Sequence, residues 1–300
     1  MHQVAECPIC NGNQFKKKYI CTDFTCSHEA FQIVECENCK LLLTSPRPEE
    51  SQLGRYYQSD KYISHSDTSK GLTNKLYKQV RTFTIGQKLR FIKSLSPEGK
   101  LLDIGSGAGY FLEACQKSGF NCTGIEPDTT TRERSILQFN ISCYPEAELD
   151  KLEENSFDII TLWHVLEHVP NLIHRIHRIH QLLKPDAYAL IAVPNHHSLD
   201  AQFYKAYWAG YDVPRHLWHF SPKNIQQLAL LHGFEVTKIK PMVFDAFYVS
   251  MLSENYLQHR FSFLRGAWIG LVSNLNSLFS KSPKSSSQIY VLKKRLHLNG

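Results

Sequence analysis

The stretch KLLDIGSGAGYFLEACQKSGFNCTGIEPD, residues 100–128, decides the fold. A short apolar run at 101–104 is followed directly by Gly105, Gly107 and Gly109, and then by a helical pattern that starts near Tyr110. A second apolar run ends at Glu126. This order predicts a buried parallel strand, a glycine turn, a helix and a second strand, which together form half of a nucleotide-binding α/β unit.

The glycine spacing helps to choose the ligand. Glycine accepts positive φ and has no Cβ, so the backbone of this loop can lie close to a bound molecule. A carboxylate at the tip of the second strand, here Glu126, is placed to accept hydrogen bonds from both hydroxyls of a ribose. The spacing is G-x-G-x-G, whereas a dinucleotide fingerprint needs its third glycine at the position of Tyr110.

At these residues the chain resembles the class I S-adenosylmethionine-dependent methyltransferases. The D-I-G that precedes the loop and the I-E-P-D that ends the second strand carry the resemblance. A dehydrogenase-type dinucleotide site or a fortuitous turn is the competing interpretation. The resemblance implies that S-adenosylmethionine is bound by Asp103, Gly105, Ser106, Gly107, Gly109, Tyr110, Glu126, Pro127, Trp163 and His164.

Composition sets the wider limits. Three hundred residues with 42% hydrophobic content can bury one large core and a smaller one. The N-terminal stretch is polar and no window holds some 18 uninterrupted apolar residues, so we expect a cytoplasmic protein without a transmembrane segment. The net charge of +6 is spread along the chain, which permits an anionic partner without requiring one.

Cysteines cluster at the N-terminus as two C-x-x-C pairs, Cys7 with Cys10 and Cys36 with Cys39. Four thiolates close a tetrahedral zinc site, and a site of four cysteines leaves no open coordination position. The pairs therefore predict a structural zinc ribbon over 1–48, with short strands at 15–20 and 30–34; a redox role is the alternative. The spacer also holds the pattern C-x-x-x-x-C-x-H, formed by Cys21, Cys26 and His28. These residues could make a second metal site, but such residues are more often loop thiols and a solvated imidazole.

A proline-rich, charged stretch at 44–50 reads as a linker, and a helical cap is expected over 49–98. Its aromatic cluster includes Tyr56, Tyr57 and Tyr62. We interpret these tyrosines as packing residues first and as lid residues second, with Tyr62 a candidate for substrate binding. The methyltransferase domain is then expected over 99–300.

The segment WHVLEHVP, residues 163–170, follows a fourth predicted strand and resembles small-molecule methyltransferases of the ubiquinone-biosynthesis type. The resemblance places Glu167 and His168 on a Glu-His pair that is thought to hold a divalent cation in some members. His164 stands where those members carry a further Glu. Imidazole is a poorer ligand for magnesium than carboxylate, so helix capping and packing without a metal is the preferred interpretation here.

The substrate side is expected at the carboxyl ends of the fourth and fifth strands. Asn195 follows the fifth strand, and the aperiodic stretch WAGYDVPRHLWHF, residues 208–220, suits a binding loop better than core packing. It recurs as D-x-P-R-H-L-x-x-F in an uncharacterised branch of the superfamily that often carries an N-terminal two-CxxC ribbon. We therefore expect substrate binding by Asp212, Arg215 and His216, with an Arg-Asp ion pair that locks the loop as the structural alternative.

The C-terminal third adds a sixth strand near 233–236, helices at 244–257 and 261–279, and a seventh, antiparallel strand at 288–292. The chain as a whole is thus expected to form a doubly wound, mostly parallel seven-stranded sheet of the Rossmann-like α/β class beside the ribbon. The two aromatic helices could form a dimer face or a membrane-surface contact, but folding back on the domain is preferred.

These features predict a methyltransferase that acts on a small molecule. The methyl group of a sulfonium is already activated, so the protein must mainly align the acceptor and exclude water. A hydroxyl or carbon acceptor also needs a general base, for which we expect His168, His216 or His164. The rival readings are an RNA methyltransferase, which the absence of a concentrated basic stripe disfavours, and a non-catalytic interaction protein.

Overall fold

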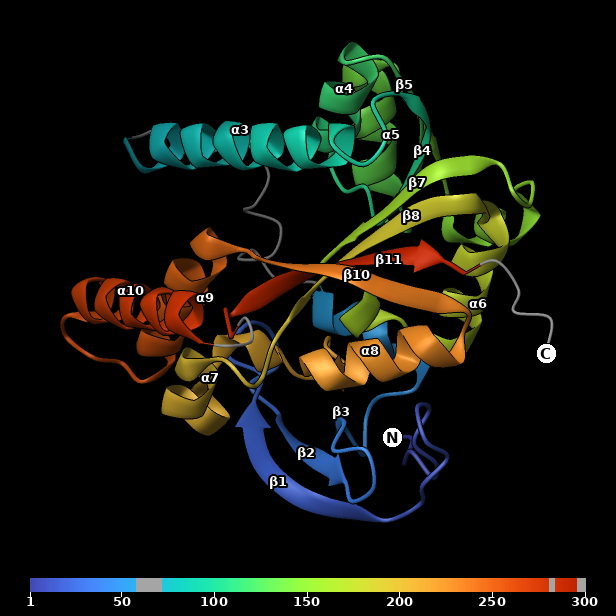
Figure 1. The fold of residues 1–300 in the computed structure, drawn as a ribbon. Coiled ribbons are helices and arrows are strands. Elements are labelled where there is room, and N and C mark those ends of the chain that lie inside the picture. Colours follow the sequence, from blue (N-terminus) through green and yellow to red (C-terminus); the bar gives the residue numbers. More distant parts are fainter. Residues whose placement is uncertain (58–71, 281–283, 296–300) are drawn as a thin grey trace.

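The computed structural model describes residues 1–57, 72–280 and 284–295. Its larger sheet has seven strands in the order β10-β11-β8-β7-β4-β5-β6 (Figure 1). The strands are β4 (Gly99–Ile104), β5 (Phe120–Ile125), β6 (Ser142–Tyr144), β7 (Phe157–Trp163), β8 (Leu183–Pro194), β10 (Phe234–Pro241) and β11 (Ser287–Lys294). The predicted seven-stranded sheet is confirmed.

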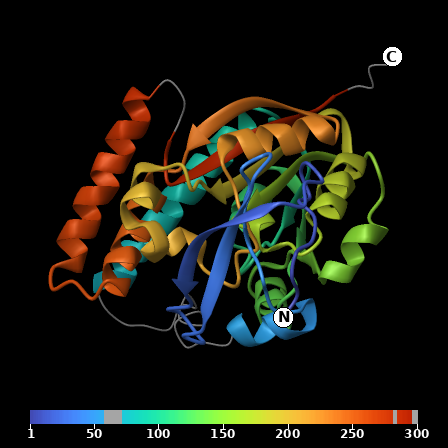
Figure 2. The same ribbon diagram turned by 90° about the horizontal axis from the view of Figure 1, so that it is seen from below.

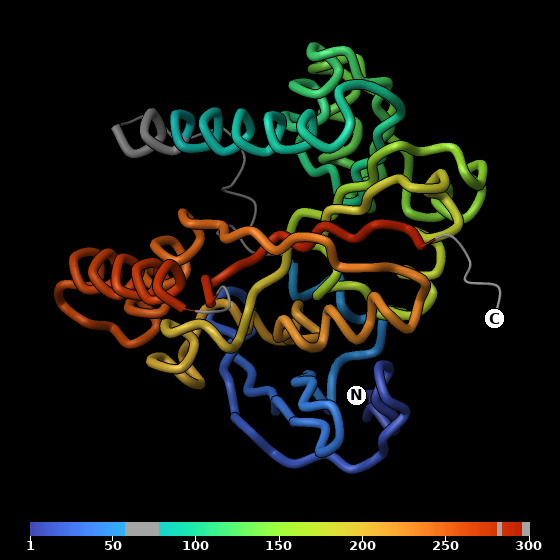
Figure 3. The backbone as a smooth tube through the Cα atoms, viewed as in Figure 1, coloured from blue at the N-terminus to red at the C-terminus, as the bar shows by residue number. Residues whose placement is uncertain are grey.

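Strand direction also matches the prediction. β4 pairs in parallel with both β5 and β7, and the β5–β6 and β7–β8 pairs are parallel as well. β11 is antiparallel to its two neighbours, β8 and β10, between which it runs in Figure 3. The strand order reverses at β4, and ligands of open α/β sheets bind outside the carboxyl ends of the strands at such a point.

Helices cover both faces of this sheet because its strands are apolar on both sides. Leu101 and Leu102 point to opposite faces and join different cores. Figure 1 shows α3 (Leu72–Lys93), α4 (Tyr110–Lys117) and α5 (Thr129–Phe139) on one face, and α6 (Leu172–Leu182) and α8 (Pro222–Leu231) on the other.

The ribbon forms a second sheet, in the order β1-β2-β3-β9 (Figure 2). β1 (Phe15–Thr22) and β2 (Ala30–Cys36) lie where the two ribbon strands were expected, and β3 (Leu42–Thr44) adds a third strand from the N-terminal segment. The fourth strand, β9 (Trp218–His219), comes from the predicted substrate loop, with Leu42 opposite His219 and Leu43 opposite Trp218. The ribbon and the methyltransferase domain therefore share a sheet.

Short helices link these layers: α1 (Glu50–Leu53), η1 (Gly54–Tyr57), η2 (Glu146–Lys151), η3 (Leu166–His168), α7 (Leu199–Tyr204), η4 (Lys205–Tyr207) and η5 (Ala209–Tyr211). Tyr62, predicted to bind substrate, lies outside the described residues. The added helices α9 (Val243–Tyr256) and α10 (Ser262–Phe279) are antiparallel neighbours (Figure 1). Among the described residues, every helix is too short or too polar to cross a membrane.

Candidate functional site

The glycine loop joins β4 to α4. Its three glycines, Gly105, Gly107 and Gly109, have φ values of +73°, +54° and +80°. Gly109 caps α4, and a Cβ there would lie 2.7 Å from Cδ1 of Ile141, so this position is closed to larger residues. A Cβ at Gly107 would meet nothing within 4 Å, which leaves open space beside the loop for a ligand.

Glu126 ends β5 and lies against the same loop. Its Oε2 accepts a hydrogen bond from the Gly107 amide at 2.8 Å, and its Oε1 accepts one from the Asp128 amide at 3.0 Å. Burial raises the pKa of Glu126, although these two amide donors oppose that shift. The structure therefore brings the glycine loop and the acidic strand end together as one unit.

Beneath the loop, Asp103 is almost completely buried and accepts a hydrogen bond from the Thr161 hydroxyl at 2.6 Å. Burial raises the pKa of Asp103 to about 7. The Lys88 ammonium of α3 lies 4.1 Å from the ring centroid of Trp163, and its charge acts on Asp103. Within residues 1–57, 72–280 and 284–295, the buried indole N–H of Trp163 has no hydrogen-bond partner.

His164 begins the segment after β7 in a left-handed conformation, with φ of 58°. Its Nε2 lies 2.8 Å from Asp245 Oδ2, and its Nδ1 lies 3.4 Å from Glu167 Oε1. Burial disfavours the charged imidazole, but the two carboxylates outweigh it and raise the pKa of His164 to about 10. His164 is therefore protonated near neutral pH, which does not suit a general base.

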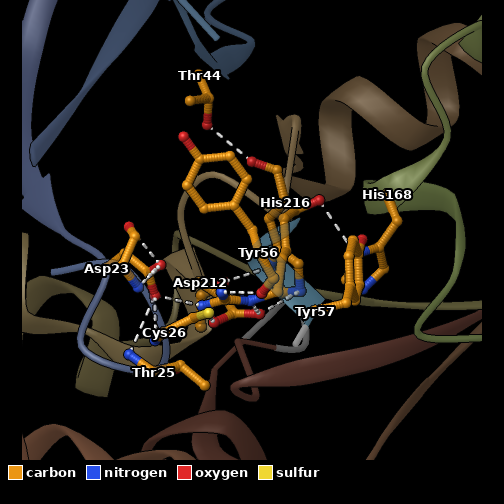
Figure 4. A network of polar contacts seen from close by, with 12 residues as sticks. Asp23, Thr25, Cys26, Thr44, Tyr56, Tyr57, His168, Asp212 and His216 are labelled. Carbon is orange, nitrogen blue, oxygen red and sulfur yellow. Dashed lines mark hydrogen bonds and ion pairs between the residues drawn. The ribbon is translucent and has the colours of Figure 1, made fainter. Parts of the chain in front are cut away.

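His168 and His216 face each other with ring centroids 4.5 Å apart (Figure 4). The Nδ1 atom of His168 lies 3.1 Å from the Arg215 carbonyl oxygen, and that of His216 lies 2.9 Å from the Gly210 carbonyl oxygen. A carbonyl only accepts, so the Nδ1 of His216 is the donor and its Nε2 carries the free lone pair. The Nδ1 of His168 also lies 3.0 Å from the Tyr57 hydroxyl, which can donate or accept. Burial is the main cause that lowers the pKa of His168 to about 4, and the nearby His216 contributes to the same shift.

Glu167 completes this group. The carboxylate is fully buried, and its charged neighbour is His164, whose Nδ1 lies 3.4 Å from Oε1. Within the described residues, neither oxygen accepts a hydrogen bond of good geometry. Ligand atoms of Glu167, His168 and His216 all lie within 4.8 Å of one another. A neutral imidazole nitrogen beside a buried carboxylate can accept a proton from a substrate, and the same three side chains have the donor types of a cation site.

Arg215 locks the predicted substrate loop in place. Its guanidinium donates hydrogen bonds to Asp212 Oδ1 at 2.6 Å, to Asp23 Oδ1 at 2.8 Å and to the Tyr56 carbonyl oxygen at 2.8 Å. The Arg215 side chain is only 1% exposed. These contacts match the structural alternative for the Asp-Arg pair, because the guanidinium has almost no surface left for a substrate.

Asn195 also serves the fold. Its side chain is fully buried, Nδ2 donates to the Ser285 carbonyl oxygen at 3.1 Å, and Oδ1 accepts from the His197 amide at 3.0 Å. An amide with no exposed surface offers a substrate nothing to contact. The structure thus places Asn195 where it fixes the exit of β8, and its role in substrate binding stays a prediction.

The cysteine pairs converge as the spacing predicts. Sγ of Cys7 lies 3.5 Å from Sγ of Cys39, and Sγ of Cys10 lies 3.5 Å from Sγ of Cys36. All four sulfurs lie within 4.8 Å of one another, which is the separation expected around a tetrahedral ion with Zn–S bonds of about 2.3 Å. Positive φ at Asn11 and Lys40 closes the turn after each pair.

The other ribbon residues in question lie apart. Cys21 is buried in the core of the ribbon, and that burial raises the pKa of its thiol to about 12. The Cys26 thiol contacts the Arg55 carbonyl oxygen at 3.4 Å, and His28 is exposed. Within the described ranges, neither Cys21 nor Cys26 belongs to a group able to hold a metal ion.

A doubly wound sheet that reverses at β4, with a glycine loop after that strand and a carboxylate after the next, defines a class I S-adenosylmethionine-dependent methyltransferase. The chain belongs to the family described as "Methyltransferase domain", whose sequence model matches residues 77–239.

Curated relatives are similar over about half of this chain. A ubiquinone biosynthesis O-methyltransferase of Rickettsia canadensis is 26% identical over 166 residues, covering 49% of this chain and 66% of the relative. The enzyme of the same name from Actinobacillus pleuropneumoniae serotype 7 is 28% identical over 171 residues, covering 52% and 72%. The chain thus spans about two thirds of the length of these relatives.

Solved structures show the same fold at low identity. A sarcosine dimethylglycine methyltransferase from Galdieria sulphuraria, described as putative, superposes with a TM-score of 0.52 at 16% identity, covering 72% of this chain and 86% of its own. A SAM-dependent methyltransferase from Archaeoglobus fulgidus gives 0.51 at 19%, covering 71% and 94%. The phosphoethanolamine N-methyltransferase 2 of Haemonchus contortus gives 0.53 at 20%, covering 85% and 63%.

Proposed function

We propose that this protein transfers the methyl group of S-adenosylmethionine to a small-molecule acceptor. The contact between the Glu126 carboxylate and the Gly107 amide carries the proposal, because it joins an acceptor for ribose hydroxyls to a loop with open space beside it. The cofactor supplies an activated methyl group on a sulfonium. The names of the curated relatives favour an oxygen acceptor, and these relatives speak against an RNA substrate or a non-catalytic role.

On the cofactor side, Glu126 would accept the ribose hydroxyls, and the glycine loop would approach the methionine portion. Trp163 and His164 lie at the end of β7, beside β4 in the sheet. The unpaired indole N–H of Trp163 fits a missing polar ligand at this place. The remaining predicted cofactor residues are Asp103, Gly105, Ser106, Gly109, Tyr110 and Pro127.

On the acceptor side, His216 is the first candidate general base, because its Nε2 lone pair is free and a Glu167 oxygen lies within 4.8 Å of its ring nitrogen. His168, whose pKa is lowered to about 4, is the weaker candidate. Glu167 would stabilise the imidazolium that forms when a base takes a proton. His164 fits a fixed positive charge better than a base. Asp212 is the predicted substrate-binding residue of the same loop, and its Oδ2 lies 4.0 Å from His216 Nε2.

The ribbon would hold one structural zinc ion through Cys7, Cys10, Cys36 and Cys39, since four convergent thiols fit that ion. The ribbon lies beside residues 208–220, which we call the acceptor loop. The Asn224 amide donates to the Cys39 carbonyl oxygen at 3.0 Å, and the Thr44 hydroxyl donates to the His216 carbonyl oxygen at 2.7 Å. The zinc site would therefore support the backbone that carries His216.

Calorimetric titration of the zinc-loaded protein with S-adenosylmethionine and S-adenosylhomocysteine tests the proposal. We expect micromolar binding of both, reduced by at least about tenfold in Glu126→Ala through the loss of charge-assisted hydrogen bonds. Glu133→Ala, an exposed change on the neighbouring helix α5, is the matched control and should bind normally. Failure of the folded protein to bind either ligand would rule the proposal out.

A further inference from the structure

The α9–α10 hairpin has its polar residues inside and its apolar residues outside. Five apolar residues of α10 follow helical spacing along its outer side, and each is 42–71% exposed. We call this set the outer stripe: Leu264, Trp268, Leu271, Leu275 and Leu278. Aqueous surfaces rarely carry such a continuous apolar face without a partner.

The inner side of α10 packs through small and polar residues. A Cβ added at Gly266 would lie 2.6 Å from Met251 Cα, and one at Gly270 would lie 2.8 Å from Phe247 Cα, so the two helix backbones are in close contact. Ser273 donates a hydrogen bond to Asp200 at 2.7 Å, and Asn274 donates one to the Val243 carbonyl oxygen at 2.9 Å. Glycine contacts combined with buried, paired polar groups are typical of helices that pack together in lipid.

The charged residues that α10 and its flanking segments carry are all basic. Residues 255–300 contain no Asp or Glu. Among the described residues, the exposed cations at the ends of α10 include Arg260 and Arg265 at the N-terminal end and Lys284 after the C-terminal end, with Arg265 also 3.2 Å from the Glu254 carboxylate. An apolar stripe between exposed cations is complementary to an anionic lipid surface.

From these observations we infer that the outer stripe docks in the plane of an anionic phospholipid bilayer. Figures 1 and 2 both place α10 at the outer edge of the molecule, where a flat surface can reach it. A second copy of the chain fits less well, because stripe-to-stripe pairing in either orientation brings the exposed Arg260 or Lys284 of one copy toward an exposed cation of the other. The 18 residues of α10, about 27 Å long at 1.5 Å per residue, would lie along the surface.

Vesicle binding by the full-length, zinc-loaded protein tests this inference. The probes are sucrose-loaded vesicles of phosphatidylcholine alone and vesicles that contain about one third phosphatidylglycerol. We expect sedimentation with the anionic vesicles and at least about fivefold weaker binding to the neutral ones, since each basic residue adds attraction to an anionic surface. Trp268→Glu/Leu271→Glu should lower anionic binding by at least about tenfold.

Matched controls separate docking from folding defects. Leu137→Glu changes a leucine that is 87% exposed on α5, far from the stripe in sequence, and should bind vesicles normally. Trp268 is 64% exposed whereas Trp208 and Trp218 are buried, so a blue shift of tryptophan emission on vesicle addition should disappear in Trp268→Phe. S-adenosylhomocysteine affinity and circular dichroism should not change in these variants.

Two results would overturn the inference. One is the absence of binding to anionic vesicles by the folded protein. The other is binding that the double glutamate variant leaves unchanged. A concentration-dependent dimer that the same variant dissociates, without vesicle binding, would instead assign the outer stripe to a second copy of the chain.

Discussion

The Arg215 guanidinium donates a 2.8 Å hydrogen bond to the Asp23 carboxylate, across 192 positions of sequence. Arg215 belongs to the acceptor loop and Asp23 to the ribbon, and both side chains are essentially buried. The same guanidinium holds Asp212 and the Tyr56 carbonyl oxygen. The ribbon thus fixes the loop that carries His216, in addition to bringing its four cysteines together.

Removal of the Asp23 charge should therefore destabilise the protein. In Asp23→Asn the buried Arg215 loses one of its two anionic partners, and breaking a buried ion pair costs about 3–5 kcal/mol. Lys18→Ala breaks the more exposed pair with Glu35 in the same ribbon and should cost less than about 1 kcal/mol. Chemical denaturation at pH 7 measures both values. Equal effects of the two changes would contradict the role assigned to Arg215.

The effect of Asp23→Asn should depend on pH. Burial disfavours the Asp23 carboxylate, but Arg215 and the amide of Ser27 together lower its pKa below the ordinary 3.8. A lowered pKa contributes stability above the unfolded value, and this contribution is lost as the pH falls through the folded value. The wild type and Asp23→Asn should therefore converge in stability below about pH 4. Denaturation curves between pH 7 and pH 2.5 test this, and a stability gap that does not narrow below about pH 4 would refute it.

Zinc removal should loosen the acceptor loop as well as the ribbon. β9 pairs with β3, which follows Cys39 closely in sequence. Hydrogen exchange after chelation should therefore accelerate in 212–220 and stay slow in β7, the central strand Phe157–Trp163. Elemental analysis should find about one zinc per chain before chelation and none in a Cys36→Ser variant. Unchanged hydrogen exchange at Leu217 and His219 in the metal-free protein would contradict the prediction that the zinc site stabilises the loop.

Gly109→Ala should destabilise the protein and weaken cofactor binding. The φ of +80° and the 2.7 Å approach to Ile141 Cδ1 together predict a loss of about 2–4 kcal/mol. Gly86→Ala is the control, because Gly86 lies inside α3 and a Cβ there meets nothing within 4 Å. It should stabilise the helix by about 0.5–1 kcal/mol. Thermal denaturation of both variants decides, and a stabilised Gly109→Ala would disprove the strain argument.

Much of this protein could be predicted from sequence because the signals are local. The period of the apolar runs, the G-x-G-x-G spacing and the carboxylate at Glu126 predicted the sheet and the loop, and the structure confirms the antiparallel seventh strand. The two C-x-x-C pairs predicted four convergent sulfurs. Each signal lies within a few residues of the geometry it specifies.

Contacts between distant segments could not be predicted in this way. No local pattern indicated that Lys88 would lie over Trp163, that Asp245 would pair with His164, or that Trp218 would extend the ribbon sheet. The predicted division into a ribbon, a cap and a catalytic domain therefore missed the shared sheet.

The sequence by itself determined which elements form and where the cofactor loop lies, because backbone conformation follows from glycine, proline and apolar period. Only the tertiary structure decided which polar side chains pair within the fold and which lie at the candidate site. Arg215 and Asn195, expected at a substrate, are buried and paired within the protein, whereas Glu167 lies buried beside His164, His168 and His216. A polar side chain has the same sequence signal in both situations, and burial and partners distinguish them.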